Sequence, residues 1–130
     1  MATCLLDTSV IIDALNDKRN RRTLLLELLK DGHLLACCAV NVTEVFAGMR
    51  PKEEEATEEF LIILDYYPIT WPVARLAGLL KRDHARKGKT LNITDVTIAA
   101  VALAHELTLL TDNVKDFPTK ELRLYPLPAA

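Results

Sequence analysis

Five acidic residues could do chemistry together in this chain. They are Asp7, Glu44, Asp95, Asp112 and Asp116, and each follows an apolar run or opens a helical pattern. Carboxylates gathered from distant segments repel one another unless a cation such as Mg²⁺ or Mn²⁺ lies among them. A cluster of this kind is suited to metal-assisted cleavage of a phosphodiester bond.

Two of these acids share a local sequence pattern. Residues 41–45 and residues 92–96 both read Asn, apolar, Thr, acid, Val. If the Asn is the N-cap, Glu44 and Asp95 each occupy the third helical position. From there an acidic side chain can accept a hydrogen bond from the N-cap backbone N–H, as in a capping box. The same position also directs a carboxylate outward, so capping and metal binding are both compatible with the pattern.

The remaining acids also have simpler interpretations. Asp7 can cap a helix that begins near Ser9, and Asp112, Asn113 and Asp116 can be turn residues because Asx side chains favour turns. The combination of all these residues at strand-to-helix junctions favours a shared site over a set of unrelated caps and turns.

Strands that alternate with helices must position these acids. Apolar runs predict strands at residues 3–6, 34–38, 66–69, 108–110 and 122–125. Helical periodicity and caps predict helices at residues 10–15, 20–30, 41–49, 53–65, 72–87 and 93–104. This order indicates one α/β domain over residues 1–130, with a central, mostly parallel sheet flanked by helices on both faces. Because ligands of such sheets bind beyond the carboxyl ends of the strands, the acids are expected at one edge.

Composition narrows the class of protein. Half of the 130 residues are hydrophobic and about a quarter are charged, as in globular domains. No apolar run reaches the roughly 18 residues of a membrane span, and the N-terminus lacks a secretory pattern, so we expect a cytoplasmic protein with no membrane association. The three cysteines have neither an even count nor C-x-x-C spacing, which indicates buried reduced thiols.

The balance of charge gives little sign of a nucleic-acid binder. The net charge is −2, although residues 18–22 and 81–89 are locally basic. These segments could contact nucleic-acid phosphates, or the second could simply complement a helix C-terminus. His33, His84 and His105 fit no motif, and we expect surface or helix-end roles for them.

Four segments carry a resemblance to a known family. Residues 5–12, 43–48, 95–103 and 110–117 resemble, in order, the four motifs of PIN-domain ribonucleases. The closest resemblance is to the VapC toxins of type II toxin–antitoxin modules. The match extends over nearly the whole chain, and although each motif alone is weak, the ordered set is specific.

The resemblance implies a PIN fold that holds Mg²⁺ or Mn²⁺ and acts as an endoribonuclease on single-stranded RNA, leaving a 5′ phosphate. Asp7 and Asp95 would be the principal metal ligands, and Glu44 a third ligand or an orienter of water. Asp112 or Asp116 would contribute the fourth carboxylate, since the family's usual position falls on Asn113 between them. The resemblance also implies a cognate antitoxin that covers the acidic site, and a homodimer or a toxin–antitoxin hetero-oligomer.

Two other classes of function remain open at this point. The chain could be a catalytically weak binding module that acts mainly through an antitoxin complex. It could also be a phosphohydrolase or phospho-acceptor domain that uses Asp7, although Asp7-Thr8-Ser9 lacks the second Asp that a dehalogenase-type enzyme places two residues later.

Overall fold

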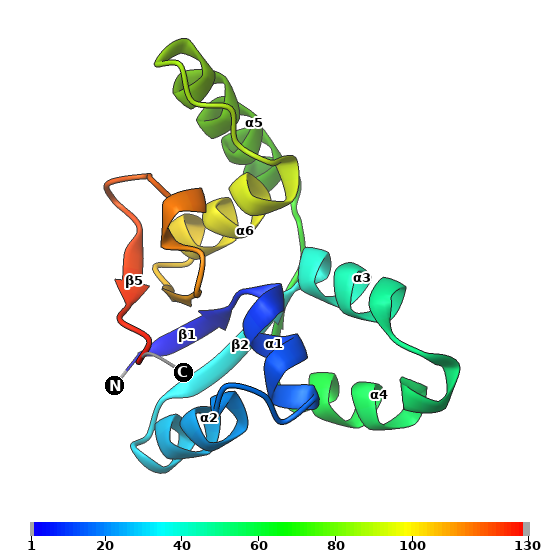
Figure 1. The fold of residues 1–130 in the computed structure, drawn as a ribbon. Helices are drawn as coiled ribbons and strands as arrows, with labels where there is room; N and C mark the ends of the chain where they lie inside the picture. The colour runs from blue at the N-terminus through cyan, green and yellow to red at the C-terminus, as the bar shows by residue number, and fades with distance from the viewer. Residues whose placement is uncertain (1, 129–130) are drawn as a thin grey trace.

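The computed structural model describes residues 2–128 and contains a five-stranded parallel sheet (Figure 1). The strand order is β3-β2-β1-β4-β5, and all four strand pairings are parallel. The strands are β1 Thr3–Leu6, β2 Leu34–Cys38, β3 Asp65–Tyr67, β4 Thr108–Leu110 and β5 Arg123–Tyr125. The expected α/β fold is therefore confirmed, with the first strand of the sequence at the centre of the sheet.

Among the described residues, six α-helices and two short 3₁₀ helices connect the strands. The α-helices are α1 Thr8–Leu15, α2 Arg21–Lys30, α3 Ala39–Gly48, α4 Glu54–Ile62, α5 Trp71–Arg86 and α6 Ile93–Ala104, and the 3₁₀ helices are η1 Pro51–Glu53 and η2 Val114–Asp116. The helix predicted over residues 53–65 is too long. Asp65 pairs with Ala36 as the first residue of β3, so pairing in the sheet overrides the local helical pattern.

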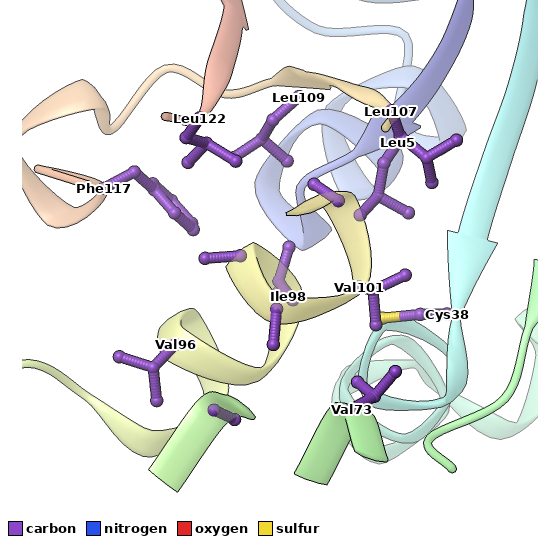
Figure 2. Close-up of a cluster of buried hydrophobic side chains, with 14 of the residues drawn as sticks. Leu5, Cys38, Val73, Val96, Ile98, Val101, Leu107, Leu109, Phe117 and Leu122 are labelled. Atoms are coloured by element: carbon purple, nitrogen blue, oxygen red, sulfur yellow. The ribbon is translucent and has the colours of Figure 1, made fainter. Parts of the chain in front are cut away.

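The helices bury two separate hydrophobic cores on the two faces of the sheet. Because successive side chains of a strand point to opposite faces, Leu5 faces the core beneath α5 and α6, whereas Leu6 faces the core beneath α1, α2 and α4. Figure 2 shows the first of these cores, where Ile98 and Val101 of α6 lie against side chains from the strands. The sheet is thus covered on both sides, as expected.

Burial along helix α6 differs from the distribution that its sequence pattern predicts. The pattern placed Ile93 and Ala104 on a continuous apolar face, yet both are exposed. Burial is concentrated in the middle of the helix, where Ile98 to Ala102 are all buried. The reason is that α6 packs against the sheet on one side and against α5 on another, so residues around most of its circumference are covered.

The parallel arrangement brings the carboxyl ends of the strands to one edge. The Asp7 backbone N–H donates to the Leu110 carbonyl at 2.9 Å, which joins the end of β1 to the end of β4. Within residues 2–128, none of the helices has both the length and the apolar character needed to span a bilayer.

Candidate active site

Asp7 follows β1 directly and caps the N-terminus of α1. Its side chain is buried, and each carboxylate oxygen accepts one hydrogen bond. Oδ1 accepts from the Thr8 backbone N–H at 2.9 Å, and Oδ2 accepts from the Thr111 hydroxyl at 2.7 Å. Burial raises the pKa of Asp7, and the Glu44 charge raises it further, whereas the bonds from Thr111 and Thr8 lower it. Asp7 is therefore a buried carboxylate held from two sides.

Thr111 sets the second of these bonds. It is buried, and its Oγ1 accepts a hydrogen bond from the Asn113 backbone N–H at 2.9 Å. A hydroxyl carries a single proton, and with the Asn113 N–H pointing at its oxygen that proton is directed to Asp7. The loop after β4 thus fixes the orientation of a carboxylate at the end of β1.

Glu44 lies in α3, but not at the position that the sequence predicted. Asn41 was expected to cap this helix, whereas the helix begins at Ala39 and Cys38 is its N-cap. Asn41 is the third helical residue, and its Oδ1 accepts from the Cys38 N–H at 2.8 Å, so Asn41 itself closes the capping box. Glu44 is consequently free of capping, and its Oε1 accepts a hydrogen bond from the Thr8 hydroxyl at 2.6 Å.

Asp95 lies in the first turn of α6, where the predicted cap is confirmed. Asn92 is the N-cap, and its Oδ1 accepts from the Thr94 backbone N–H at 2.8 Å and from the Thr94 hydroxyl at 2.6 Å. Burial raises the pKa of Asp95 to about 6, and the negative charges of Asp7, Asp116 and Glu44 contribute to that increase. The charges of three carboxylates from three other segments therefore act on Asp95 at this edge of the sheet.

The two candidates for the fourth carboxylate have different surroundings. Asp116 ends η2 and is one of the charges that raise the pKa of Asp95. Asp112 is bound by arginines instead: its Oδ1 lies 2.6 Å from Arg21 Nη2, and its Oδ2 lies 3.3 Å from Arg19 Nη1. Asn113 contributes its backbone N–H to Thr111. The charges of Asp7, Glu44 and Asp116 thus all act on Asp95, whereas the Asp112 carboxylate is paired with two arginines.

Several residues that position the acids were not foreseen from the sequence. They are Asn41, Arg21 and the acceptor role of Thr111 towards Asn113. The sequence offered a signal only for Asn41, whose interval of three residues from Cys38 fits a capping box in which Asn replaces the usual acid.

The donor set fits a hard divalent cation. Carboxylate and hydroxyl oxygens are the ligands that Mg²⁺ and Mn²⁺ prefer, and each Asp7 oxygen retains a free lone pair beside its one hydrogen bond. The buried Ser9 Oγ, which lies close enough to lower the pKa of Asp7, makes no hydrogen bond within residues 2–128. Within the same residues, no three histidine, cysteine or acidic side chains are already close enough to surround an ion. A bound cation would offset the mutual repulsion of carboxylates at this edge.

Two cavities of the structure lie away from the carboxylates. A cavity of about 440 Å³ between α1, α3 and α4 is lined by residues such as Ile12, Val45 and Met49. A second cavity of about 310 Å³ is lined by residues of α2 and α4 such as Leu29 and Phe60. Neither cavity includes any of the four acids, so the chemistry of the site follows from its charges rather than from a deep pocket.

The histidines and cysteines take the structural roles expected of them. His33 Nδ1 accepts from the Ala2 backbone N–H at 3.0 Å, His84 contacts Thr119, and His105 packs against Tyr67. The three cysteines are buried and form no disulfide. None of these residues is among the groups that act on Asp7 or Asp95.

Comparison with known proteins gives one consistent family. The model of the PIN domain matches residues 4–119. Ribonuclease VapC19 of Mycobacterium tuberculosis is 32% identical over 88% of this chain and 91% of its own length. Ribonuclease VapC10 of the same organism is 34% identical over 90% of this chain and 87% of its own length. A toxin–antitoxin complex from Klebsiella pneumoniae contains a chain that is 25% identical, with a TM-score of 0.74 and coverage of 90% of this chain and 92% of that one.

Proposed function

This chain belongs to the PIN-domain family, among the VapC ribonucleases, and we propose that it cleaves RNA phosphodiester bonds as a divalent-metal-dependent endoribonuclease. The observation that carries the proposal is the group formed by Asp7, Glu44, Asp95 and Asp116, in which the pKa of Asp95 is raised to about 6. Asp7 and Asp95 have raised pKa values, and the charges of Glu44 and Asp116 contribute to the rise at Asp95. Perturbed carboxylates of this kind favour a functional site over a set of helix caps.

The surroundings of each carboxylate determine the role that we propose for it. Asp7 and Asp95 would hold Mg²⁺ or Mn²⁺, because they are the carboxylates whose pKa values burial and neighbouring charges raise. Glu44 keeps one oxygen on the Thr8 hydroxyl, so its other oxygen is available to the ion or to the attacking water. When bound, the ion would supply a Lewis acid for the phosphate and lower the pKa of water at the site.

Asp116 is the proposed fourth carboxylate, in place of Asp112. The negative charge of Asp116 contributes to the raised pKa of Asp95, whereas both oxygens of Asp112 are bound by Arg21 and Arg19. A carboxylate neutralised by two guanidinium groups has little charge left to offer a cation.

We further propose that the chain is the toxin of a type II toxin–antitoxin pair and is cytoplasmic. The support is its likeness to the Klebsiella pneumoniae complex and to the VapC relatives. The partner would be a cognate antitoxin, and assembly would give a homodimer or a toxin–antitoxin hetero-oligomer. The one competing function is a catalytically weak binding module that acts mainly through that complex.

An RNA cleavage assay tests the proposal. The purified chain would be incubated with total RNA and Mn²⁺ or Mg²⁺, with and without a chelator, beside Asp7→Asn and Asp95→Asn variants. Asp83→Asn is the matched control, because Asp83 is an exposed carboxylate in a surface pair with Arg82. We expect cleavage that needs the ion, is lost in both site variants and is unchanged in the control.

Two outcomes would contradict the proposal in different ways. Equal cleavage by the wild type and the two site variants would overturn these residue roles. No cleavage by any protein, together with tight binding of a small protein encoded by the neighbouring gene, would favour the binding module.

A further inference from the structure

Asn41 is fully buried and connects α3 to α1. Its Oδ1 accepts from the Cys38 backbone N–H at 2.8 Å, and its Nδ2 donates to Thr8 Oγ1 at 3.0 Å. A backbone N–H can only donate, so the amide oxygen must face Cys38 and the amide nitrogen must face Thr8. The junction between β2 and α3 therefore determines the orientation of this side chain.

The Thr8 hydroxyl transmits that orientation to Glu44. Its oxygen receives the Asn41 amide N–H, which leaves its only proton for another acceptor. That acceptor is Glu44 Oε1, at 2.6 Å. The bonds form a directed chain in which every donor and acceptor is fixed, from Cys38 through Asn41 and Thr8 to Glu44.

From this chain of bonds we propose that Asn41 is a positioning residue for Glu44 and acts through the Thr8 hydroxyl. The role rests on the proposed function, because it gives Glu44 a fixed orientation towards a bound cation. Asn41 orients Thr8, Thr8 holds Oε1, and Oε2 is presented to the site. Partners that orient metal ligands in this indirect way commonly change metal affinity by about 10-fold to 100-fold when they are removed.

Helix capping alone does not account for Asn41. Its Oδ1 completes the capping box of α3, and that role needs no group on the Nδ2 side. The Nδ2 atom instead donates to a residue 33 positions away, at the N-terminus of α1 beside Asp7. A residue that only capped α3 would affect stability and leave cation binding unchanged, so the two roles can be separated by experiment.

The test is calorimetric titration of the purified chain with Mn²⁺ alone. The variants are Asn41→Ala, Thr8→Val and the double variant, with Thr8→Ser as the conservative variant that retains the hydroxyl. Thr70→Ala is the control, since the Thr70 hydroxyl caps α5 through the Val73 N–H and contacts none of the four acids. Loss of that cap lowers stability without touching the site.

We expect Asn41→Ala and Thr8→Val each to weaken Mn²⁺ binding about tenfold. The double variant should bind no more weakly than either single variant, because both changes interrupt the same chain of bonds. Thr8→Ser and Thr70→Ala should bind Mn²⁺ like the wild type. Thr8→Val leaves the α3 cap intact, so it tests the same step if Asn41→Ala does not fold.

Different results would contradict the role of Asn41 and the proposed metal-dependent function. Wild-type affinity in Asn41→Ala or in Thr8→Val, or losses that multiply in the double variant, would overturn the role of Asn41 alone. Failure of the wild type to bind Mn²⁺ would overturn the metal-dependent function, and the role of Asn41 with it.

Discussion

Arg21 and Asp112 form a largely buried ion pair between residues 91 positions apart in the sequence, with Arg21 Nη2 2.6 Å from Asp112 Oδ1. Arg21 is only 1% exposed, and its Nη2 also donates to the Pro128 carbonyl at 3.2 Å. The pair joins the start of α2 to the loop after β4, which carries Thr111 and Asp116. This ion pair therefore links α2 to the loop after β4 and occupies the Asp112 carboxylate.

Breaking this pair should destabilise the fold. Arg21→Met would leave Asp112 with little solvent and without its main partner, so the free energy of unfolding should fall by about 3 kcal/mol. Urea denaturation measures this change. Asp112→Leu added to Arg21→Met should recover part of the loss, because it removes the unpaired charge.

The matched control is Arg82→Met. Arg82 pairs with Asp83 at 3.0 Å, but both side chains are about half exposed, so the change should cost less than about 1 kcal/mol. An equal loss of unfolding free energy in Arg21→Met and Arg82→Met would mean that burial does not increase the contribution of the Arg21 pair to stability.

Asp112 and Asp116 should respond differently to neutralisation. Asp116→Asn should weaken Mn²⁺ binding and slow RNA cleavage by about tenfold, because it removes a carboxylate that acts on Asp95. Asp112→Asn should lower stability and leave Mn²⁺ affinity within about twofold, because its charge is already paired with Arg21. Titration calorimetry and urea denaturation on both variants separate the two effects, and the reverse pattern would restore Asp112 as the fourth carboxylate.

Asp95 should make the metal-free protein less stable as the pH rises. Its pKa is raised to about 6 in the fold, against about 3.9 in an unfolded chain. The fold thus favours the protonated carboxyl, and this stabilising contribution is complete below about pH 4 and is lost as the pH rises through 6. Asp95→Asn removes the charge, so in the presence of a chelator its Tm should exceed that of the wild type at pH 7.5 by roughly 3 °C or more.

The same comparison at pH 4 supplies the check, because the wild-type carboxyl is then largely protonated and the advantage of Asp95→Asn should shrink. Asp83→Asn, which changes an exposed carboxylate, should show no such dependence on pH. An advantage of Asp95→Asn that is the same at both pH values would contradict the raised pKa.

The Thr111 hydroxyl should contribute more to the free energy of unfolding than an exposed hydroxyl does. Thr111→Val keeps the shape of the side chain but deprives the buried Asp7 Oδ2 and the Asn113 N–H of their partner. We expect a loss of about 1–3 kcal/mol in the free energy of unfolding. Thr43→Val is the control, since the exposed Thr43 hydroxyl bonds only the Ala39 carbonyl within its own helix; a comparable loss there would remove the special role of Thr111.

A divalent cation should stabilise the wild type and not the site variants. Any ligand that binds only the folded state adds to its stability, by about 2.7 kcal/mol at a free concentration about 100 times Kd. Mn²⁺ should therefore raise the Tm of the wild type, and Asp7→Asn should lose most of that increase. Equal increases in the two proteins would place the bound ion elsewhere.

Much of the fold was predictable from local sequence. Apolar runs bounded by turn residues located the strands within a few residues, and Asn92 indicated the start of α6 correctly. The start of α3 was placed too late, because the Asn41 side chain closes the cap from inside the helix instead of from its first position. The end of α4 was missed because Asp65 pairs with β2, a contact that helical periodicity does not encode.

The sequence by itself determined which residue types stand at the strand ends, because strand ends and helix starts depend on neighbouring residues. Asp7 and Asp95 could be named in this way without knowledge of any contact between them. Only the tertiary structure decided that Asp112 is paired, because its partner Arg21 comes from a distant helix. Local sequence patterns locate a carboxylate at the edge of the sheet. Whether that carboxylate is paired with a cationic side chain depends on residues that are distant in the sequence.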